Sequence, residues 1–233
     1  MKKPKYSLSI VIPTLNEINS ISKTINIISK INIKKEIILV ISRELTTLNT
    51  KIHLKKLKKF NSEIKIYFQK KPFVGGAVMT GIQKSKFSHI ALMASDLETN
   101  PYHLNKLVSK SMRNKNFIIC GDRWLRKNSF KNYGFINLML NMFSQKLLKL
   151  FIPLNINDLT FAYRIYPKKA LKNCIIKEFR NGWSLELLIC PYKKNYNFLS
   201  VATTWTARNE GDKSNAIKNY ISFFKILIYY LLK

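Results

Sequence analysis

The sequence has few acidic residues, few cysteines and no long apolar run. Only 12 Asp and Glu residues accompany 41 Lys and Arg residues among 233, so the formal net charge is +29. A surface this basic attracts polyanions, such as phosphorylated substrates, anionic lipid head groups or nucleic acid. Lys, Asn and Ile are abundant together, so a compositional bias explains the charge equally well. The 46% hydrophobic content excludes a disordered chain.

The scarcity of cysteine excludes two kinds of stabilised small fold. Cys120, Cys174 and Cys190 are far apart and lack any Cys-x-x-Cys or Cys/His metal spacing. We therefore expect neither a disulfide framework nor a zinc site, and a reducing cytoplasm as the location. His53, His89 and His103 show no ligand spacing either.

No stretch reaches the about 18 uninterrupted apolar residues that a membrane-spanning helix needs. The apolar start is short and runs into Pro13 without a cleavage site, so it predicts a strand and not a signal peptide. The stretch 220–233 is apolar apart from Ser222, Lys225 and the terminal Lys233. It either packs on the domain's own core or lies on a membrane surface. The basic residues are spread without an interleaved aromatic motif, so no nucleic-acid partner is expected.

Short β-branched runs alternate with helical periodicity in the first half of the chain. Strands are expected at 8–15, 35–42, 63–69, 89–95 and 116–124. Between the first two, isoleucines recur at helical intervals of three and four residues. This alternation is typical of an α/β fold with a mostly parallel sheet and helices on both faces.

After residue 124 the alternation becomes irregular, which predicts a mixed sheet edge and a covering lobe. No repeat or linker divides the chain. We expect a single domain, 1–233, with a nucleotide-binding half (1–124), an acceptor-side half (125–215) and a C-terminal amphipathic helix (216–233).

Polar clusters follow three of the predicted strands. They are Pro13-Thr14-Leu15-Asn16-Glu17, Asp96-Leu97-Glu98 and Gly121-Asp122-Arg123-Trp124. In open parallel sheets, ligands bind outside the carboxyl ends of the strands. The three clusters therefore predict a binding site at one edge of the sheet.

Six segments, in order, resemble family-2 glycosyltransferases with the GT-A fold. They are SIVIPTLNE, GGAVMTGI, ALMASDLETNP, GDRW, DLTFAYRIYPKKAL and WTARNEGDKSN, within residues 7–215. The strongest resemblance is to the dolichol-phosphate mannose synthase branch and its bacterial polyprenyl-phosphate relatives. It implies an inverting transfer of sugar from a nucleotide sugar, and Mg²⁺ or Mn²⁺ as cofactor.

In that branch, an Asp-Ala-Asp-Leu run binds the metal against the donor diphosphate. Here Ala94 stands where the first Asp is expected, Asp96 matches the second, and Glu98 falls two residues later. The resemblance makes Asp96 and Glu98 the metal ligands, since hard cations bind through one or two carboxylates plus substrate phosphates. Two alternatives are that the acids merely begin a helix, or that metal-dependent catalysis has been lost.

The resemblance also implies a nucleotide-binding set: Pro13, Thr14, Glu17, Ser42, Gly75 and Asp96. Ser42 stands where relatives carry the Asp that meets the base, so the base is left open. The turn at Glu17 is equally compatible with a simple helix start, and Gly75 with close packing.

The phosphate- and acceptor-binding candidates are Arg123, Arg164, Arg208 and Lys213. Guanidinium groups bind phosphate oxygens bidentately, although an isolated Arg is more often a solvated surface charge. Asp158 is expected to orient Arg123 or Arg164, while Glu186 has the pattern of a helix acid. Asp96, Asp158 and Arg208 form the predicted catalytic set.

The resemblance favours polyprenyl phosphate as acceptor, because the apolar stretch 135–152 and the C-terminal tail can contact lipid at the inner face of the cytoplasmic membrane. A phosphate acceptor is already anionic and needs no general base. A saccharide or lipopolysaccharide acceptor is the first alternative. The second is a degenerate domain that binds nucleotide without catalysis.

Overall fold

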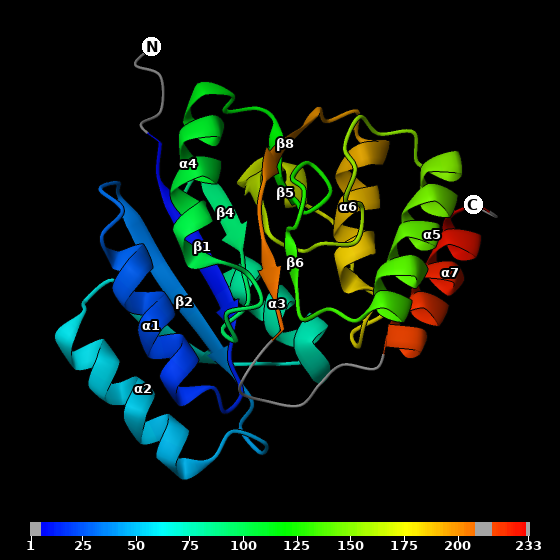
Figure 1. The fold of residues 1–233 in the computed structure, drawn as a ribbon. Coiled ribbons are helices and arrows are strands. Elements are labelled where there is room, and N and C mark those ends of the chain that lie inside the picture. The colour runs from blue at the N-terminus through cyan, green and yellow to red at the C-terminus, as the bar shows by residue number, and fades with distance from the viewer. Residues whose placement is uncertain (1–5, 208–215, 232–233) are drawn as a thin grey trace.

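The chain folds around one large, mostly parallel sheet (Figure 1). The computed structural model describes residues 6–207 and 216–231, without the side chains of residues 216–220 and 231. The strands of this sheet are β1 (Leu8–Pro13), β2 (Lys35–Ile41), β3 (Ile64–Phe68), β4 (His89–Leu92), β5 (Ile118–Asp122), β7 (Arg164–Pro167) and β8 (Phe198–Ala202). The α/β fold class predicted from the sequence is confirmed.

The strand order is β3-β2-β1-β4-β7-β5-β8. Strand β7 is antiparallel to β4 and to β5, and the other neighbours pair in parallel. The mixed part of the sheet is therefore internal, whereas the irregular sequence pattern predicts it at an edge. A second, small sheet pairs β6 (Phe130–Lys131) with β9 (Trp205–Thr206) in parallel.

Helices cover both faces of the sheet (Figure 1). One face carries α1 (Ile18–Ser29), α2 (Leu48–Phe60) and α4 (Leu104–Arg113). The other face carries α3 (Phe73–Lys84), α5 (Phe135–Phe151), α6 (Trp183–Lys193) and α7 (Ala216–Leu231). Two short 3-10 helices, η1 (Pro101–His103) and η2 (Lys168–Leu171), precede α4 and α6 in the chain. Because successive strand residues point to opposite faces, Ile10 and Ile12 join one hydrophobic core and Val11 the other. Both faces of the central strands are thus buried.

Helix α7 packs against α5 and α6. Its Phe223, Ile226 and Leu227 are buried in the core, as expected for a final helix packed on its own domain, while Ile221 and Ile228 are half exposed. Among residues 6–207 and 216–231, no helix has both the length and the hydropathy needed to cross a membrane.

The cysteines depart from the sequence prediction. Cys174 and Cys190 form a disulfide with a Cα–Cα distance of 5.8 Å, which joins the segment after η2 to α6. The prediction of no disulfide was wrong because the pair is brought together by tertiary packing and has no recognisable spacing. Cys120 is a free, buried thiol in β5, and burial raises its pKa to about 12.

Helix α3 approaches β1 closely at Gly81. A Cβ added there would lie 2.2 Å from Cγ1 of Val11, closer than any real contact. Both residues are buried, and the β-branched Val11 has little rotamer freedom with which to move aside. The hydrogen atom of Gly81 is therefore required for α3 to pack on the centre of the sheet.

We predict that Gly81→Ala lowers the free energy of unfolding by about 1–3 kcal/mol through overpacking. Urea unfolding followed by circular dichroism measures it. Gln83→Ala, on the exposed side of the same helix, is the control and is expected to stay within about 0.5 kcal/mol of the unmodified protein. Equal stability of the two variants would show that β1 yields at this contact.

Candidate active site

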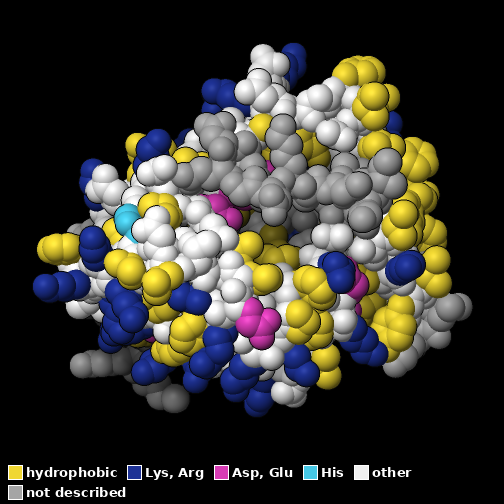
Figure 2. Space-filling model, turned by 90° about the horizontal axis from the view of Figure 1, so that it is seen from below, with side chains coloured by type: hydrophobic (Ala, Val, Ile, Leu, Met, Phe, Trp, Pro, Cys, Tyr) yellow, Lys and Arg dark blue, Asp and Glu magenta, His cyan; other side chains and the backbone are white. Residues whose placement is uncertain are grey.

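A cavity of about 870 Å³ opens at the carboxyl ends of the parallel strands. Figure 2 shows the molecule from this side, and its surface is hollowed near the centre. The lining includes residues at or after the ends of five strands: Pro13, Thr14 and Glu17 at the end of β1; Ser42 and Leu45 after β2; Gln69 after β3; Ser95, Asp96 and Glu98 after β4; and Arg123 after β5. The predicted convergence of polar segments at one sheet edge is therefore present in the structure.

Asp96 and Glu98 both line the cavity, at a tight turn after β4. The Asp96 Oδ1 atom accepts a hydrogen bond of 3.0 Å from the backbone N–H of Glu98. Leu97, between them, has a φ of 64°, a left-handed conformation that is uncommon for a non-glycine residue. The turn therefore presents two carboxylates, two residues apart, to the same cavity, with Ala94 also in its wall.

Glu17 connects the turns after β1 and β4. Its Oε2 atom accepts hydrogen bonds from the backbone N–H of Leu15 at 2.8 Å and from the hydroxyl of Ser95 at 3.2 Å. Ser95 in turn also donates to the carbonyl of Pro13. Glu17 makes no side-chain capping bond to α1, so its carboxylate shapes the cavity wall and does not cap the helix.

Ser42 lines the cavity at the turn that follows β2. Its hydroxyl oxygen accepts from the N–H of Leu45 at 3.1 Å, and its own N–H donates to the hydroxyl of Thr46 at 3.1 Å. These bonds form the turn that follows β2 and bring Leu45 to the cavity. Leu45, Gln69 and Phe73 line the same cavity, and the acid of this turn, Glu44, is not part of its lining.

Arg123 and Asp158 form a buried, bidentate ion pair. The Arg123 Nε and Nη2 atoms donate to the two carboxylate oxygens of Asp158 at 2.6 and 3.0 Å. Asp158 has no exposed surface, whereas Arg123 is 6% exposed and reaches the cavity wall. The rings of Phe130 and Phe161 lie 5.2 and 4.4 Å from the Arg123 guanidinium carbon. Asp158 thus holds Arg123 in one orientation beside the cavity.

Helix α5 completes the support of this pair. Gln145 donates to Asp158 Oδ1 at 3.3 Å and to the hydroxyl of Thr160 at 2.8 Å, and its own Oε1 accepts from the N–H of Leu159. Asn141, one turn earlier, donates to the hydroxyl of Tyr133 at 2.9 Å. Asn141, Tyr133 and Thr160 line the cavity, so the polar side of α5 forms its wall on the side of Arg123.

Two predicted binding residues are not in the cavity lining. Arg164 is fully buried in β7 and donates to the carbonyls of Leu159 and Ser184 and to the hydroxyl of Tyr166. Its guanidinium is occupied within the core, because β7 is inserted into the interior of the sheet, so the phosphate-binding prediction for Arg164 is corrected.

Gly75 is also a packing residue. Its N–H donates to the carbonyl of Phe179 at 2.7 Å, and an added Cβ would lie 2.7 Å from Cα of Phe179. The residues around it, Phe73, Val74 and Ala77, line the cavity, but Gly75 does not. The nucleotide-binding prediction for Gly75 is therefore corrected in favour of close packing. Arg208 and Lys213 lie outside the described residues.

Sequence reasoning missed the segment before α6. Arg180, Asn181 and Trp183 line the cavity, and the guanidinium carbon of Arg180 lies 3.8 Å from the centre of the Phe73 ring. Buried Glu186 holds this segment by accepting hydrogen bonds from the N–H groups of Lys177 and Glu178. Burial raises the pKa of Glu186. No local motif marks Arg180, because its place depends on this tertiary anchoring.

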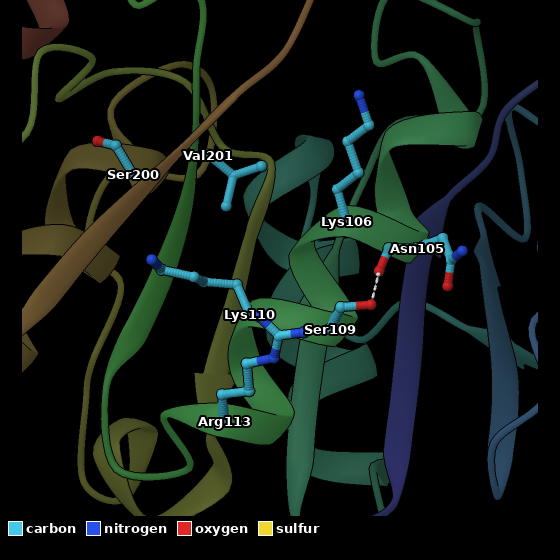
Figure 3. A pocket seen from close by; sticks show the side chains of 7 residues that line it. All are labelled: Asn105, Lys106, Ser109, Lys110, Arg113, Ser200 and Val201. Atoms are coloured by element: carbon cyan, nitrogen blue, oxygen red, sulfur yellow. Dashed lines mark hydrogen bonds between the residues drawn. The ribbon is translucent and has the colours of Figure 1, made fainter.

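A separate, open hollow of about 420 Å³ lies between α4 and β8 (Figure 3). It is lined by Asn105, Lys106, Ser109, Lys110, Arg113, Ser200 and Val201. The basic side chains come from the outer side of α4, and none of the predicted site residues lies there. The cavity at the strand ends is therefore the candidate active site.

Residues 9–175 match the sequence model of the family described as Glycosyl transferase family 2. The chain belongs to this family. It is thus a glycosyltransferase that uses a nucleotide-sugar donor, with the GT-A fold. The match does not distinguish the dolichol-phosphate mannose synthase branch, which stays a prediction.

Solved structures with a similar fold include glucosyl-3-phosphoglycerate synthase from Mycobacterium tuberculosis. Its complex with Mn²⁺, uridine diphosphate and glucosyl-3-phosphoglycerate is 16% identical, with a TM-score of 0.71 over 97% of this chain and 79% of that one. Its complex with Mn²⁺ and UDP-glucose is 17% identical, with a TM-score of 0.71 over 97% and 78%. A structure described only as a mycobacterial protein is 15% identical, with a TM-score of 0.70 over 97% and 74%.

We predict that Asp158→Ala lowers the free energy of unfolding by about 3–5 kcal/mol, because it leaves the buried Arg123 charge uncompensated. Urea unfolding provides the measurement. The double variant Arg123→Met/Asp158→Leu removes both charges and is expected to be more stable than Asp158→Ala alone. A loss below about 1 kcal/mol in Asp158→Ala would mean that this pair contributes as little as a surface salt bridge.

Proposed function

We propose that this family-2 glycosyltransferase moves a sugar from a UDP-sugar to a phosphate-bearing lipid acceptor, by a single inverting displacement in the cavity at the strand ends. The observation that carries the proposal is the cavity itself, in which the Asp96 and Glu98 carboxylates and the oriented Arg123 come from neighbouring parts of one sheet edge. The acceptor would be met at the inner face of the cytoplasmic membrane.

The donor side of the proposal uses a divalent cation, Mg²⁺ or Mn²⁺, held by Asp96 and Glu98. Within the described residues there is no group of three or more His, Cys, Asp and Glu side chains placed to hold a metal. A two-carboxylate site suits a hard cation whose other ligands are substrate phosphates and water. When bound, such a cation supplies Lewis-acid stabilisation to the departing diphosphate. The similar synthase was solved with Mn²⁺ and UDP, which supports this donor set.

The residues that line the cavity near the ends of β2 and β3 support uracil as the base of the donor nucleotide. Ser42 and Gln69 are neutral hydrogen-bonding residues, and Leu45 and Phe73 provide apolar walls. Guanine presents adjacent N–H donors that a carboxylate matches best, whereas uracil presents mixed donors and acceptors that an amide or hydroxyl can match. The carboxylate of Glu17, the nearest acid after β1, already accepts two hydrogen bonds within the protein.

The acceptor side supports a phosphate nucleophile. Among the described residues that line the cavity, the carboxylates are Glu17, Asp96 and Glu98. Glu17 is engaged in the wall and the other two are the proposed metal ligands, so no further carboxylate remains there to deprotonate a hydroxyl. A phosphate is already anionic and needs no general base. Arg123, fixed by Asp158, offers the positive charge that attracts it and orients it.

The acceptor alternatives are a small phosphorylated acid, as in the similar synthase, and a saccharide. A non-catalytic nucleotide-binding domain is the remaining alternative, motivated by Ala94 and Ser42 at positions where relatives carry Asp. Two experiments separate these possibilities.

We predict that Mn²⁺ strengthens UDP binding, measured by thermal shift with UDP, GDP and their sugar conjugates. Asp96→Ala is expected to abolish the metal-dependent part of the shift, and Glu98→Ala to lower the metal-dependent affinity at least tenfold, because each removes a cation ligand. Glu63→Gln, which alters a surface acid far from the cavity, is the control. A full metal-dependent shift in Asp96→Ala would contradict the assignment of Asp96 as a ligand of the cation.

We predict that radiolabelled UDP-sugar yields a lipid-extractable product with polyprenyl phosphate in detergent micelles. Arg123→Lys is expected to lower kcat/KM about 100-fold, because a lysine cannot keep both the bidentate bond to Asp158 and the phosphate contact. Arg113→Lys on α4 is the control. Label appearing only in 3-phosphoglycerate or in a glycan would overturn the lipid acceptor, and no turnover of any UDP-sugar would favour the non-catalytic alternative.

A further inference from the structure

Helix α5 is amphipathic in the reverse sense of an ordinary surface helix. Its buried residues are Asn141, Ser144, Gln145 and Leu148, so its inner side is mostly polar. That side faces the cavity and the Arg123–Asp158 pair, as the hydrogen bonds of Gln145 show. Three polar residues of α5, Asn141, Ser144 and Gln145, are therefore buried inside the protein.

The outer side of α5 is apolar and open to solvent. Its exposed large side chains are Phe135, Ile136, Met139, Phe143, Leu150 and Phe151. Ile136, Phe143 and Leu150 are separated by seven residues and lie on one stripe of the helix, with exposures of 74%, 63% and 77%. A surface helix normally turns such a stripe toward the core. Each large apolar side chain forgoes the favourable free energy of burial while it stays in water.

Helix α7 extends this surface. It packs on α5, as Figure 1 also shows, and its exposed Ile221 and Ile228 lie seven residues apart on one stripe with Lys225 between them. Figure 2 shows hydrophobic side chains gathered along the right-hand edge, the side on which Figure 1 places the two helices. We call the exposed side chains of Phe135, Ile136, Met139, Phe143, Lys146, Leu150, Phe151, Ile221, Lys225 and Ile228 the outer face.

The charged residues of the two helices that carry the outer face, α5 and α7, are all basic. Residues 123–157 contain six Lys and Arg and no Asp or Glu, and residues 213–233 contain no acid either. Lys146 on α5 and Lys225 on α7 are both exposed. Apolar side chains beside long cationic ones match the boundary between acyl chains and anionic head groups. A symmetric pair of copies would instead bring like charges together across the same patch.

We propose that the outer face docks on the surface of an anionic lipid bilayer without crossing it. The inference deepens the proposed function, because Asn137 and Asn141 of the same helix, and Tyr133 just before it, line the cavity. A bilayer bound to the outer face would therefore lie beside the acceptor wall of the cavity. The docking itself requires no transfer reaction, so it is tested independently.

The test is vesicle flotation of the intact protein, with no donor, metal or acceptor present. The probes are vesicles of phosphatidylcholine alone and of phosphatidylcholine with phosphatidylglycerol in equal parts, at near-physiological salt. We expect the protein to float with the anionic vesicles. Phe143→Ser/Leu150→Ser is expected to lower the partition coefficient at least tenfold, and Lys146→Gln/Lys225→Gln to lower it about fivefold per lysine.

The matched control is Leu48→Ser/Phe60→Ser on α2, whose side chains are 72% and 86% exposed on the opposite face of the sheet. It is expected to float like the unmodified protein. Equal binding of all variants, or no binding to anionic vesicles, overturns the proposal. A dimer in light scattering that Phe143→Ser/Leu150→Ser converts to monomer, without vesicle binding in either form, assigns the outer face to a second copy instead.

The two proposals fail separately. Flotation without lipid-linked product would leave the outer face intact and overturn only the acceptor. Transfer to polyprenyl phosphate in micelles without flotation would support the acceptor and overturn the docking of the outer face on a bilayer.

Discussion

The buried pair of Arg123 and Asp158 is the interaction on which one wall of the cavity depends. Two further hydrogen bonds join the chain segments that carry the pair. The Asp122 carboxylate accepts from the backbone N–H of Asn157 at 2.9 Å, and the Asp158 carboxylate accepts from the backbone N–H of Arg123 at 3.3 Å. The end of β5 and the segment before β7 thus hold each other reciprocally. Removing a cation and an anion from water is costly unless both are paired and hydrogen-bonded, and here the surrounding amides meet that condition.

The wall that contains Glu17 and Asp96 follows a different physical rule. It is built from turns after parallel strands, where the backbone leaves the sheet and short polar side chains fix the exit direction. Glu17, Ser95 and Asp96 all form hydrogen bonds within these turns. The wall that contains Arg123, by contrast, is supported by α5, a helix whose inner side is polar.

Much of the fold and part of the site could be predicted from residues alone. The recurring isoleucines of α1 and the β-branched strand residues predict a sheet covered by helices. The rule that ligands bind at the carboxyl ends of parallel strands predicts that Glu17, Ser42 and Asp96 line one cavity. Arg164 could not be placed, because its burial depends on β7 entering the sheet between two earlier strands. The sequence predicted an apolar stretch at 135–152, but it did not indicate which of its side chains face inward. The Cys174–Cys190 bond likewise depends on tertiary proximity.

The position of β7 has a consequence for how the chain is made. Strand β5 pairs only with β7 and β8 among the described strands, and both come later in the sequence. During synthesis, residues 118–122 therefore leave the ribosome before either strand that pairs with them. These residues, which are buried in the folded protein, have no neighbouring strand until at least residue 167 has also emerged. Unpaired strand edges of this kind are prone to aggregation. The sheet thus stays incomplete until the second half of the chain is made, and a fragment ending near residue 124 would lack both strands that pair with β5.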